Sequence, residues 1–317
     1  MGEKAVNSKW KQGVKVISKF KSGIGLIVLV IALSLASDYF LTAHNLLNVT
    51  RQVSINAILA VGMTFVILTG GIDLSVGSVL ALSSAITAGL LASGTGIFLA
   101  ILAGILVGTV LGLVNGLMVA KAKMPAFIVT LGMMTIARGL TLIYSDGRPI
   151  SGFNEVFRFI GAGYLGPIPM PVVIMVIILV VCYIVLKKIP FGRYVYAIGG
   201  NEKASKLSGI NTDTVKTSVY MISGFLAAVS GVILAARLNS AQPTAGTSYE
   251  LDAIAAVVLG GTSLSGGQGG IIGTIIGALI IGVLNNGLNL LNVSSFYQLV
   301  AKGAVILIAV FLDRRSQ

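Results

Sequence analysis

The side chains of this chain that could do acid–base, nucleophilic or metal chemistry are few and scattered. Its 317 residues contain one histidine, His44, one cysteine, Cys182, and ten carboxylates. A catalytic nucleophile needs a base within hydrogen-bond reach, and a metal site needs several clustered ligands. A lone histidine and a lone cysteine supply neither arrangement. We therefore expect no catalytic residue, no metal site and no cofactor in this chain, and we do not expect an enzyme.

One motif points to nucleotide chemistry. Residues 264–268 read LSGGQ, the nucleotide-contacting signature of ATP-binding-cassette (ABC) ATPases. Such an ATPase also needs a phosphate-cradling GxxxxGK[ST] loop that follows a strand in a soluble α/β domain. The sequence has no such loop. We interpret LSGGQ as a tight loop at the membrane surface that does not bind ATP.

The composition is that of a polytopic membrane protein. Hydrophobic residues make up 56% of the chain and charged residues 10%, with a mean hydropathy of +0.97. An ordinary globular protein has about 25% charged residues. The net charge of +12 is better explained by lipid headgroups and membrane orientation than by nucleic acid, which we do not expect as a partner.

The apolar segments predict an all-α fold of about ten transmembrane helices, some of them broken or re-entrant. A helix needs about 20 residues to cross the hydrocarbon core, and the segment at 251–262 is too short to do so alone. It is either a half-helix or extends back into the preceding loop. The segments lie at 24–41, 54–70, 75–93, 97–120, 126–144, 171–186, 217–238, 251–262, 271–291 and 296–312.

Basic residues orient these segments. If the N-terminus is cytoplasmic, inside-facing stretches hold the six lysines between Lys4 and Lys21, then Lys121 and Lys123, six residues between 187 and 216, and the pair 314–315. Outside-facing stretches hold only Arg51, Arg148, Arg158 and Arg237. Lys and Arg accumulate in cytoplasmic loops, so this bias predicts ten crossings with both termini in the cytoplasm.

The basic N-terminal segment, residues 1–23, precedes a single transmembrane domain at 24–317. The lysines, the apolar run from Ile24 and the small residues near Ala36 resemble a signal peptide. We favour a retained first span, because the apolar run continues to Leu41 and the last segments need a partner to keep both termini inside. Trp10, Val14 and Ile17 share one helical face, which predicts a short interfacial helix.

The polar loop between Lys187 and Lys216 interrupts the apolar sequence and predicts a contact with a soluble partner. Within it, Asn201 can cap a helix and Gly209 can end one. A short surface helix held against the membrane domain is suited to receiving a push from outside the bilayer. Its residues are Asn201, Glu202, Lys203, Ala204, Ser205, Lys206, Leu207, Ser208 and Gly209.

Polar residues in or beside the spans are candidates for a translocation path. Asp73 lies in the break 69–75 and either caps the next helix, beginning at Leu74 or Ser75, or contacts substrate directly. The break has polar groups near membrane depth, so we expect it to be buried in protein or to line a cavity. Amides in spans more often hold neighbouring helices together than bind a ligand. No carboxylate is expected in the middle of a span, which disfavours a proton-coupled carrier. The candidates are Asp73, Ser75, Asn115, Asn285, Asn286 and Asn289.

Glycines recur every four residues in two segments. One stripe runs through 104, 108, 112 and 116, and the other through 269, 273 and 277. Such stripes let helix backbones approach closely inside lipid. We expect them to pack within the chain, although a subunit interface is the alternative.

Three stretches together resemble a known family. Residues 67–78 (ILTGGIDLSVGS), 190–210 (PFGRYVYAIGGNEKASKLSGI) and 237–267 (RLNSAQPTAGTSYELDAIAAVVLGGTSLSGG) are similar to the permease subunits of bacterial monosaccharide ABC importers. The resemblance extends from about Leu41 to Arg315 and is greatest to the permeases of ribose importers. Many members of the family have an Arg or Lys near the position of Gln268, so LSGGQ looks like a local substitution.

The resemblance implies a multi-pass protein of the bacterial cytoplasmic membrane that forms a homodimer. It also implies a cytoplasmic ATPase subunit, which binds ATP and Mg, and an extracytoplasmic sugar-binding protein. The capped segment 201–209 then corresponds to the coupling helix that docks on the ATPase. Arg148, Arg158, Glu250 and Asp252 become candidate contacts for the binding protein, although the two carboxylates suit a helix N-terminus equally well. The alternative function is a sodium-coupled secondary sugar carrier.

Overall fold

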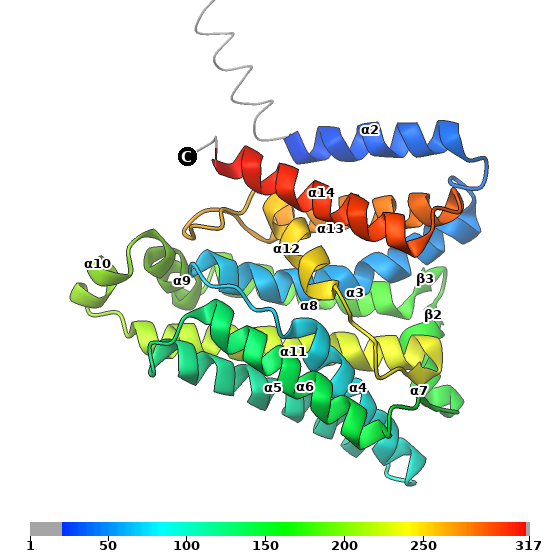
Figure 1. Ribbon diagram of the computed structural model, residues 1–317, viewed down its shortest axis with the longest axis horizontal. Helices are drawn as coiled ribbons and strands as arrows, with labels where there is room; N and C mark the ends of the chain where they lie inside the picture. Colours follow the sequence, from blue (N-terminus) through cyan, green and yellow to red (C-terminus); the bar gives the residue numbers. More distant parts are fainter. Residues whose placement is uncertain (1–20, 315–317) are drawn as a thin grey trace, which may run out of the picture.

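The computed structural model describes residues 21–314 and is all-helical apart from four two-residue strands. The interfacial helix expected in residues 1–20 and the basic Arg315 lie outside the described residues. Figure 1 shows long helices lying side by side, with shorter ones at both ends of the bundle. The helices are α2 (Lys21–Ala36), α3 (Ala43–Leu68), α4 (Val76–Ala92), α5 (Ile97–Ala120), α6 (Ala126–Ser145), α7 (Glu155–Ala162), α8 (Met170–Lys187), α9 (Pro190–Gly200), α10 (Glu202–Leu207), α11 (Thr212–Leu238), α12 (Tyr249–Leu259), α13 (Ile271–Leu290) and α14 (Ser295–Arg314).

Each of the ten apolar segments corresponds to one helix, from α2 to α6, then α8 and α11 to α14. Within the described part of the chain, six helices are long and apolar enough to cross a membrane: α3, α5, α6, α8, α11 and α13. Helices α2 and α4 are apolar but shorter. The polytopic all-helical architecture is therefore as predicted.

The small strands and α7 lie together at one end of the bundle. Strand β1 (Ile150–Ser151) pairs antiparallel with β4 (Ser240–Ala241), and β2 (Tyr164–Leu165) pairs with β3 (Ile168–Pro169). Helix α7 begins where the side chain of Asn154 accepts the backbone N–H of Phe157. Helices α9 and α10 occupy the opposite end of the bundle (Figure 1).

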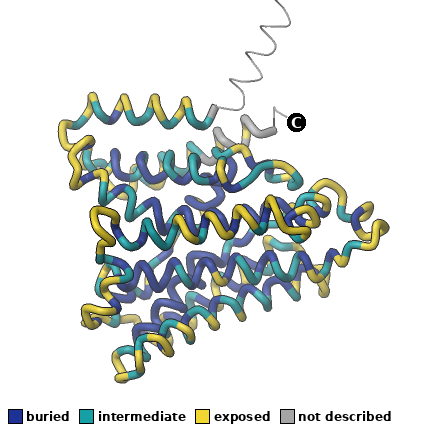
Figure 2. The backbone as a smooth tube through the Cα atoms, turned by 180° about the vertical axis from the view of Figure 1, so that it is seen from behind, coloured by how far each residue is buried: buried dark blue, intermediate teal, exposed yellow. Residues whose placement is uncertain are grey.

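Helices α3 and α11 form the centre of the bundle. Figure 2 shows the buried centre of the bundle in dark blue. Both helices are buried along most of their length, whereas α2 and α8 have many exposed apolar residues. In a membrane protein such exposed apolar residues face lipid. The expectation that the glycine stripes pack within the chain is confirmed. A Cβ at Gly112 would overlap the Tyr220 carbonyl of α11, and one at Gly277 would overlap the Ala256 carbonyl of α12.

Two of the apolar segments are broken helices. After α3 ends at Leu68, the chain returns through residues 69–75 before α4 begins inside the bundle (Figure 1). After α11 ends at Leu238, it returns through 239–248 before α12 begins, also inside the bundle. Of the two alternatives for 251–262, the structure shows a half-helix, because α12 has 11 residues and begins only two residues earlier, at Tyr249. Helix α4 is longer, at 17 residues, but it also begins inside the bundle after a break, and we call both half-helices. The first turn of α4 meets the segment just before α12, because a Cβ at Gly77 would overlap the carbonyl of Gly246.

The two halves of the chain repeat one order of elements in opposite directions. The end of α3 lies beside α9, where a Cβ at Gly199 would overlap the Leu68 carbonyl, whereas the end of α11 lies beside α7. In each half, a buried helix is followed by a break, a half-helix and a glycine-striped helix. The striped helices share a sequence pattern, GLVNGL at 112–117 and GVLNNGL at 282–288. Inverted repeats with broken helices are typical of membrane transporters.

Candidate functional site

Helix α10 is the capped surface helix predicted from the polar loop. The Asn201 side-chain oxygen accepts the backbone N–H of Ala204 at 2.9 Å, and Gly209 has a left-handed φ of +84°. Lys216 of α11 donates to the Glu202 carboxylate at 2.6 Å and holds α10 against the bundle. The cap and the stop are therefore both where the sequence placed them.

Two features of this end were not predicted. The residues before α10 form another helix, α9, which begins with Pro190 in its first turn and buries Val195 and Ile198. Leu207, the last residue of α10, is 90% exposed. The sequence signal for α9 was Pro190 followed by apolar residues at helical spacing.

The LSGGQ residues form a loop whose glycines pack against other backbone segments. Gly266 and Gly267 both have left-handed φ values, and the N–H of Gly267 donates to the Leu68 carbonyl at 3.0 Å. A Cβ on Gly199 would overlap Leu68 and Gly267, and one on Gly266 would lie 3.0 Å from the Cα of Gly199. We call these four residues the glycine junction. It joins the end of α3 to the end of α9.

The glycine junction leads to a prediction about ATP. Because close backbone packing accounts for the glycines of LSGGQ, we expect Ser265→Ala to leave the nucleotide affinity of a complex with an ATPase subunit unaltered. The purified chain alone should not be photolabelled by an azido-ATP analogue. Labelling that free ATP competes away would contradict this expectation.

Asp73 is the centre of a buried polar cluster at the start of α4. Its carboxylate accepts the backbone N–H and the hydroxyl of Ser75 at 3.0 and 2.6 Å, and the hydroxyl of Ser223 at 2.8 Å. Asn115 donates to the Ser75 hydroxyl at 2.9 Å. Helix α4 begins at Val76, slightly later than expected. These bonds tie the start of α4 to α5 and α11.

No carboxylate lies in the middle of a described helix, as expected, but Asp73 in the break 69–75 lies at the depth of one. Asp73 is 1% exposed and bonds Ser223, near the middle of α11, so it lies inside the bundle. This agrees with the expectation that the break 69–75 is buried in protein near membrane depth. Because α4 begins inside the bundle, the boundary between the two segments lies at depth.

The three predicted asparagines of α13 do not form one site. Asn286 and Asn45 of α3 exchange two hydrogen bonds, at 2.8 and 3.0 Å. Asn285 donates to Asp252 of α12, and Asn289 is exposed and accepts from Gln298 of α14. Each amide bonds a different element, which is the helix-packing role that polar side chains play in membrane bundles.

A charged belt surrounds the start of α12. Its members are Arg138 of α6, Glu250 and Asp252 of α12, and Lys302 of α14. Lys302 donates to Asp252 at 2.9 Å, and Asp252 is only 3% exposed. Asp252 is therefore not available to a binding protein, and that expectation is corrected, because the half-helix carries it inside the bundle. Arg138 donates from Nη1 to the carbonyls of Pro243 and Ala245 at 2.6 and 2.8 Å.

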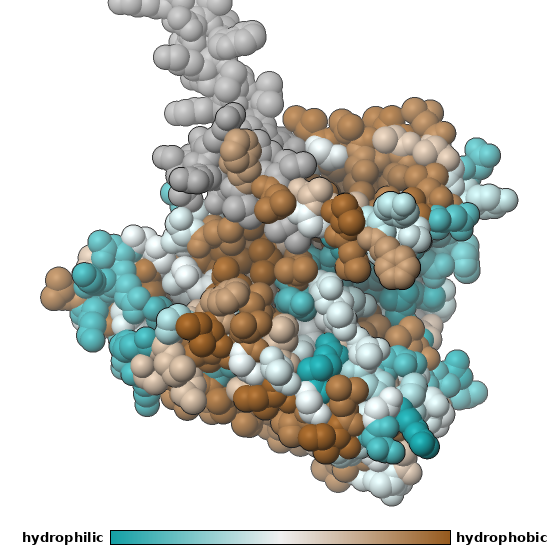
Figure 3. Space-filling view, in the orientation of Figure 1, coloured by the Kyte–Doolittle hydropathy of each residue, from teal (hydrophilic) through white to brown (hydrophobic). Residues whose placement is uncertain are grey.

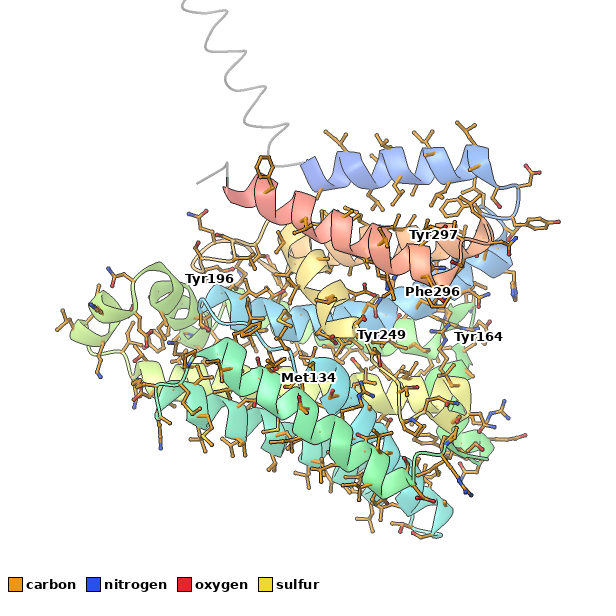
Figure 4. All side chains as sticks on the ribbon, viewed as in Figure 1. Met134, Tyr164, Tyr196, Tyr249, Phe296 and Tyr297 are labelled. Atoms are coloured by element: carbon orange, nitrogen blue, oxygen red, sulfur yellow. The ribbon has the colours of Figure 1, made fainter. Side chains whose placement is uncertain are left out.

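Arg138 and Lys302 were not among the predicted site residues. The available signal was that they are the two basic residues that lie within apolar segments and away from the segment ends. Figure 3 shows polar surface crossing the middle of the face formed by α6, α12 and α14, between apolar areas. Figure 4 places Met134 of α6 and Tyr249 of α12 on the same face. The other two predicted outside residues, Arg148 and Arg158, are exposed near the α7 end of the bundle.

The described residues 21–314 contain no group of three histidine, cysteine or carboxylate side chains that could hold a metal ion. Their polar groups connect helices and line one face of the bundle. This arrangement can exchange hydrogen bonds with a polar solute at membrane depth.

Comparisons with known proteins agree with a transport role. The family described as "Branched-chain amino acid transport system / permease component" matches residues 45–310. The ribose import permease protein RbsC of Bacillus subtilis is 61% identical over 95% of this chain and 94% of its own length. The RbsC protein of Haemophilus influenzae is 56% identical over 92% of both chains. The D-allose transport system permease protein AlsC of Escherichia coli is 43% identical over 91% of this chain and 89% of its own length. No solved structure matches the chain.

A match over residues 45–310 covers all but the ends of the chain, and the relatives share both its length and much of its sequence. The chain therefore belongs to this family of transport-system permease components, the one described as "Branched-chain amino acid transport system / permease component".

Proposed function

We propose that this chain is the transmembrane permease subunit of a bacterial ABC importer for ribose. The observation that carries the proposal is the gradation among its relatives. The ribose import permeases of three bacterial species are 52–61% identical to it, whereas the D-allose and L-arabinose permeases are 43% and 41% identical. The chain matches all of them over nearly its whole length, so ribose is the sugar that its sequence favours.

Such a permease lies in the cytoplasmic membrane and works with two partners, one on each side of it. A cytoplasmic ATPase subunit binds ATP and Mg and supplies the energy, and an extracytoplasmic binding protein delivers the sugar. The chain itself moves the sugar and carries out no reaction. Helix α10 is suited to dock on the ATPase, because it is capped at both ends, anchored by Lys216 and tipped by Leu207.

In the proposed topology, the ten apolar segments cross the membrane with both termini in the cytoplasm, α4 and α12 doing so together with the breaks that precede them. Residues 1–23 are a cytoplasmic segment, 24–317 are one transmembrane domain, and 187–216 are its coupling loop. The bias of basic residues supports this orientation. It is also supported by the grouping of α9 and α10 at one end of the bundle and of α7 and the strands at the other (Figure 1).

A second copy of the chain completes the proposed permease as a homodimer. Arg138 and Glu250 are half-buried on the face that α6 and α12 share. Charged side chains at membrane depth face protein or water rather than hydrocarbon. A second permease placed against this face would shield it from lipid and leave a path between the two copies.

None of the relatives named above is a sodium-coupled carrier. The sequence argued against an ion-coupled carrier because it predicted no carboxylate in the middle of a span. Asp73 and Asp252 are buried inside the bundle, so that argument no longer holds. The choice between importer and carrier therefore rests on the relatives. The test is ribose uptake into proteoliposomes that contain the permease, its ATPase and the binding protein. We expect uptake to require ATP. Uptake driven by a sodium gradient without ATP would refute the importer.

The proposed topology predicts labelling from opposite sides. In a Cys182→Ala background, Lys203→Cys on α10 and Gly152→Cys near α7 should react with an impermeant thiol reagent from the cytoplasm and from outside, respectively. Both positions are exposed in the structure. If intact cells were labelled from outside at both positions, the ten-crossing arrangement would be wrong.

The end of α10 predicts a coupling defect. Gly209 has open space around it, but its φ of +84° is unfavourable for a β-branched residue, so the cost comes from backbone strain. We expect Gly209→Val, or Ala204→Phe on the exposed face of α10, to lower uptake and sugar-stimulated ATP hydrolysis together. Membrane abundance should stay near normal, because α10 lies outside the bundle. Lys203→Gln is the control, and an equal loss in that variant would mean that charge alone matters.

A further inference from the structure

The charged belt lies at a depth where charge is unfavourable. Arg138 is about two helical turns, or about 10 Å, from the end of α6 at Ser145. Lys302 is a similar distance from the start of α14 at Ser295. In a hydrocarbon core of about 30 Å, both side chains lie well below the surface. Residues of this kind mark substrate pathways.

The four members of the belt differ in how many of their polar atoms remain accessible to a solute. Asp252 and Lys302 bond one another, and Asp252 also accepts from Asn285. Arg138 uses Nη1 for two backbone carbonyls and interacts electrostatically with Glu250. Arg138 and Glu250 are both partly accessible. The first pair therefore supports the structure, whereas the second has polar atoms that a solute can reach.

The fold holds Glu250 in a fixed position. Its Oε2 would lie 2.8 Å from a Cβ at Gly77, so the carboxylate sits directly against the first turn of α4. It also belongs to the first turn of α12. The positive ends of two half-helices thus converge on one carboxylate. Binding groups held this way lose little conformational entropy when a ligand arrives.

We propose that Arg138 and Glu250 form a hydrogen-bonding station for the hydroxyl groups of a passing monosaccharide. A carboxylate accepts hydrogen bonds and a guanidinium donates them, and each sugar hydroxyl can do both. The belt holds two cations and two carboxylates, so it offers polar contacts without a net charge that would trap an ion. A transport site must bind its solute weakly enough to release it. This inference rests on the proposed function, and it assigns that function its sugar contacts.

The first test measures the ribose molecules imported for each ATP hydrolysed by the complete complex in proteoliposomes. We expect Glu250→Gln and Arg138→Gln to lower this ratio at least tenfold. The control, Asp146→Asn, removes a charge at the exposed end of the same α6 and should keep the wild-type ratio. An unchanged ratio in both test variants, including an equal fall of uptake and hydrolysis, would overturn the proposal. If the wild-type complex imported no ribose with ATP, the proposed function itself would fail.

The second test asks whether water reaches the surface beside Arg138 and Glu250. In a Cys182→Ala background, Thr247→Cys beside the start of α12 should react with a small hydrophilic methanethiosulfonate reagent in the assembled complex. Ribose present during transport should slow the reaction. Ile136→Cys is the control, because Ile136 is exposed but about 200° around α6 from Arg138. An unreactive Thr247→Cys, or equal reaction at both positions, would mean that no polar path runs here.

Discussion

Replacing Gly199 with alanine is expected to lower sugar uptake and sugar-stimulated ATP hydrolysis at least tenfold in the assembled complex. The new methyl group would overlap the carbonyl of Leu68 and the N–H of Gly267, and these two groups bond one another. Because both overlapping groups belong to the backbone and cannot rotate away, the end of α9 has to move away from the end of α3. Inserting a methyl group into packed structure costs about 1–3 kcal/mol, and we expect the cost to fall on the link between α9 and α3.

The neighbouring Gly200 provides a matched control. A Cβ there would meet no atom within 4 Å, and Gly200 lacks a left-handed φ. Gly200→Ala should therefore behave like the wild type in the same proteoliposome assay. Gly266→Ala should reproduce the Gly199→Ala defect from the other side of the junction. Equal activity of the variants at 199 and 200 would show that the packing of the glycine junction does not matter for the coupling of ATP hydrolysis to uptake.

Removing Lys302 is expected to destabilise the protein more than removing any exposed lysine. Its ammonium bonds Asp252, which is 3% exposed, so Lys302→Ala leaves a buried carboxylate without its cation. Breaking a buried pair in this way costs about 3–5 kcal/mol. We expect a clearly lower melting temperature of the detergent-solubilised protein. The double variant Lys302→Ala with Asp252→Asn should recover much of the loss, because it removes the orphaned charge.

The control for Lys302 is Lys123→Ala. Lys123 pairs with Asp213, but both side chains are largely solvent-accessible, at 57% and 33% exposed. Exposed pairs contribute about 0–1 kcal/mol, so this variant should melt within a degree or two of the wild type. Similar melting temperatures for the two single variants would contradict the burial of the Asp252 pair.

The sequence predicted the helices well because lipid demands them. Each apolar segment had to become a helix, since unpaired backbone groups are unfavourable in hydrocarbon. The cap at Asn201 and the stop at Gly209 were readable for a similar reason, because both are local. Helix α9 was missed because its polar and basic residues resembled those of a loop.

The depth of the polar residues could be predicted from the sequence only in part. The break 69–75 was expected near membrane depth, and Asp73 is buried there. Asp252 stands at the start of a segment that is either a half-helix or extends into the preceding loop, and only the tertiary fold shows that it lies inside the bundle. The same fact moved Asp252 from an expected partner contact to a buried ion pair with Lys302, and it placed Arg138 near Glu250.

The oppositely directed halves also bear on how this chain could have arisen. Each half contributes five of the ten apolar helices, α2 to α6 and then α8 with α11 to α14. A second copy that follows an odd number of crossings enters the membrane from the other side. Duplication of a five-helix unit would therefore invert its copy without any change of sequence. A break that arose once in the ancestral unit would then appear twice, pointing inward from both faces, which brings Gly77 and Gly246 together at the centre.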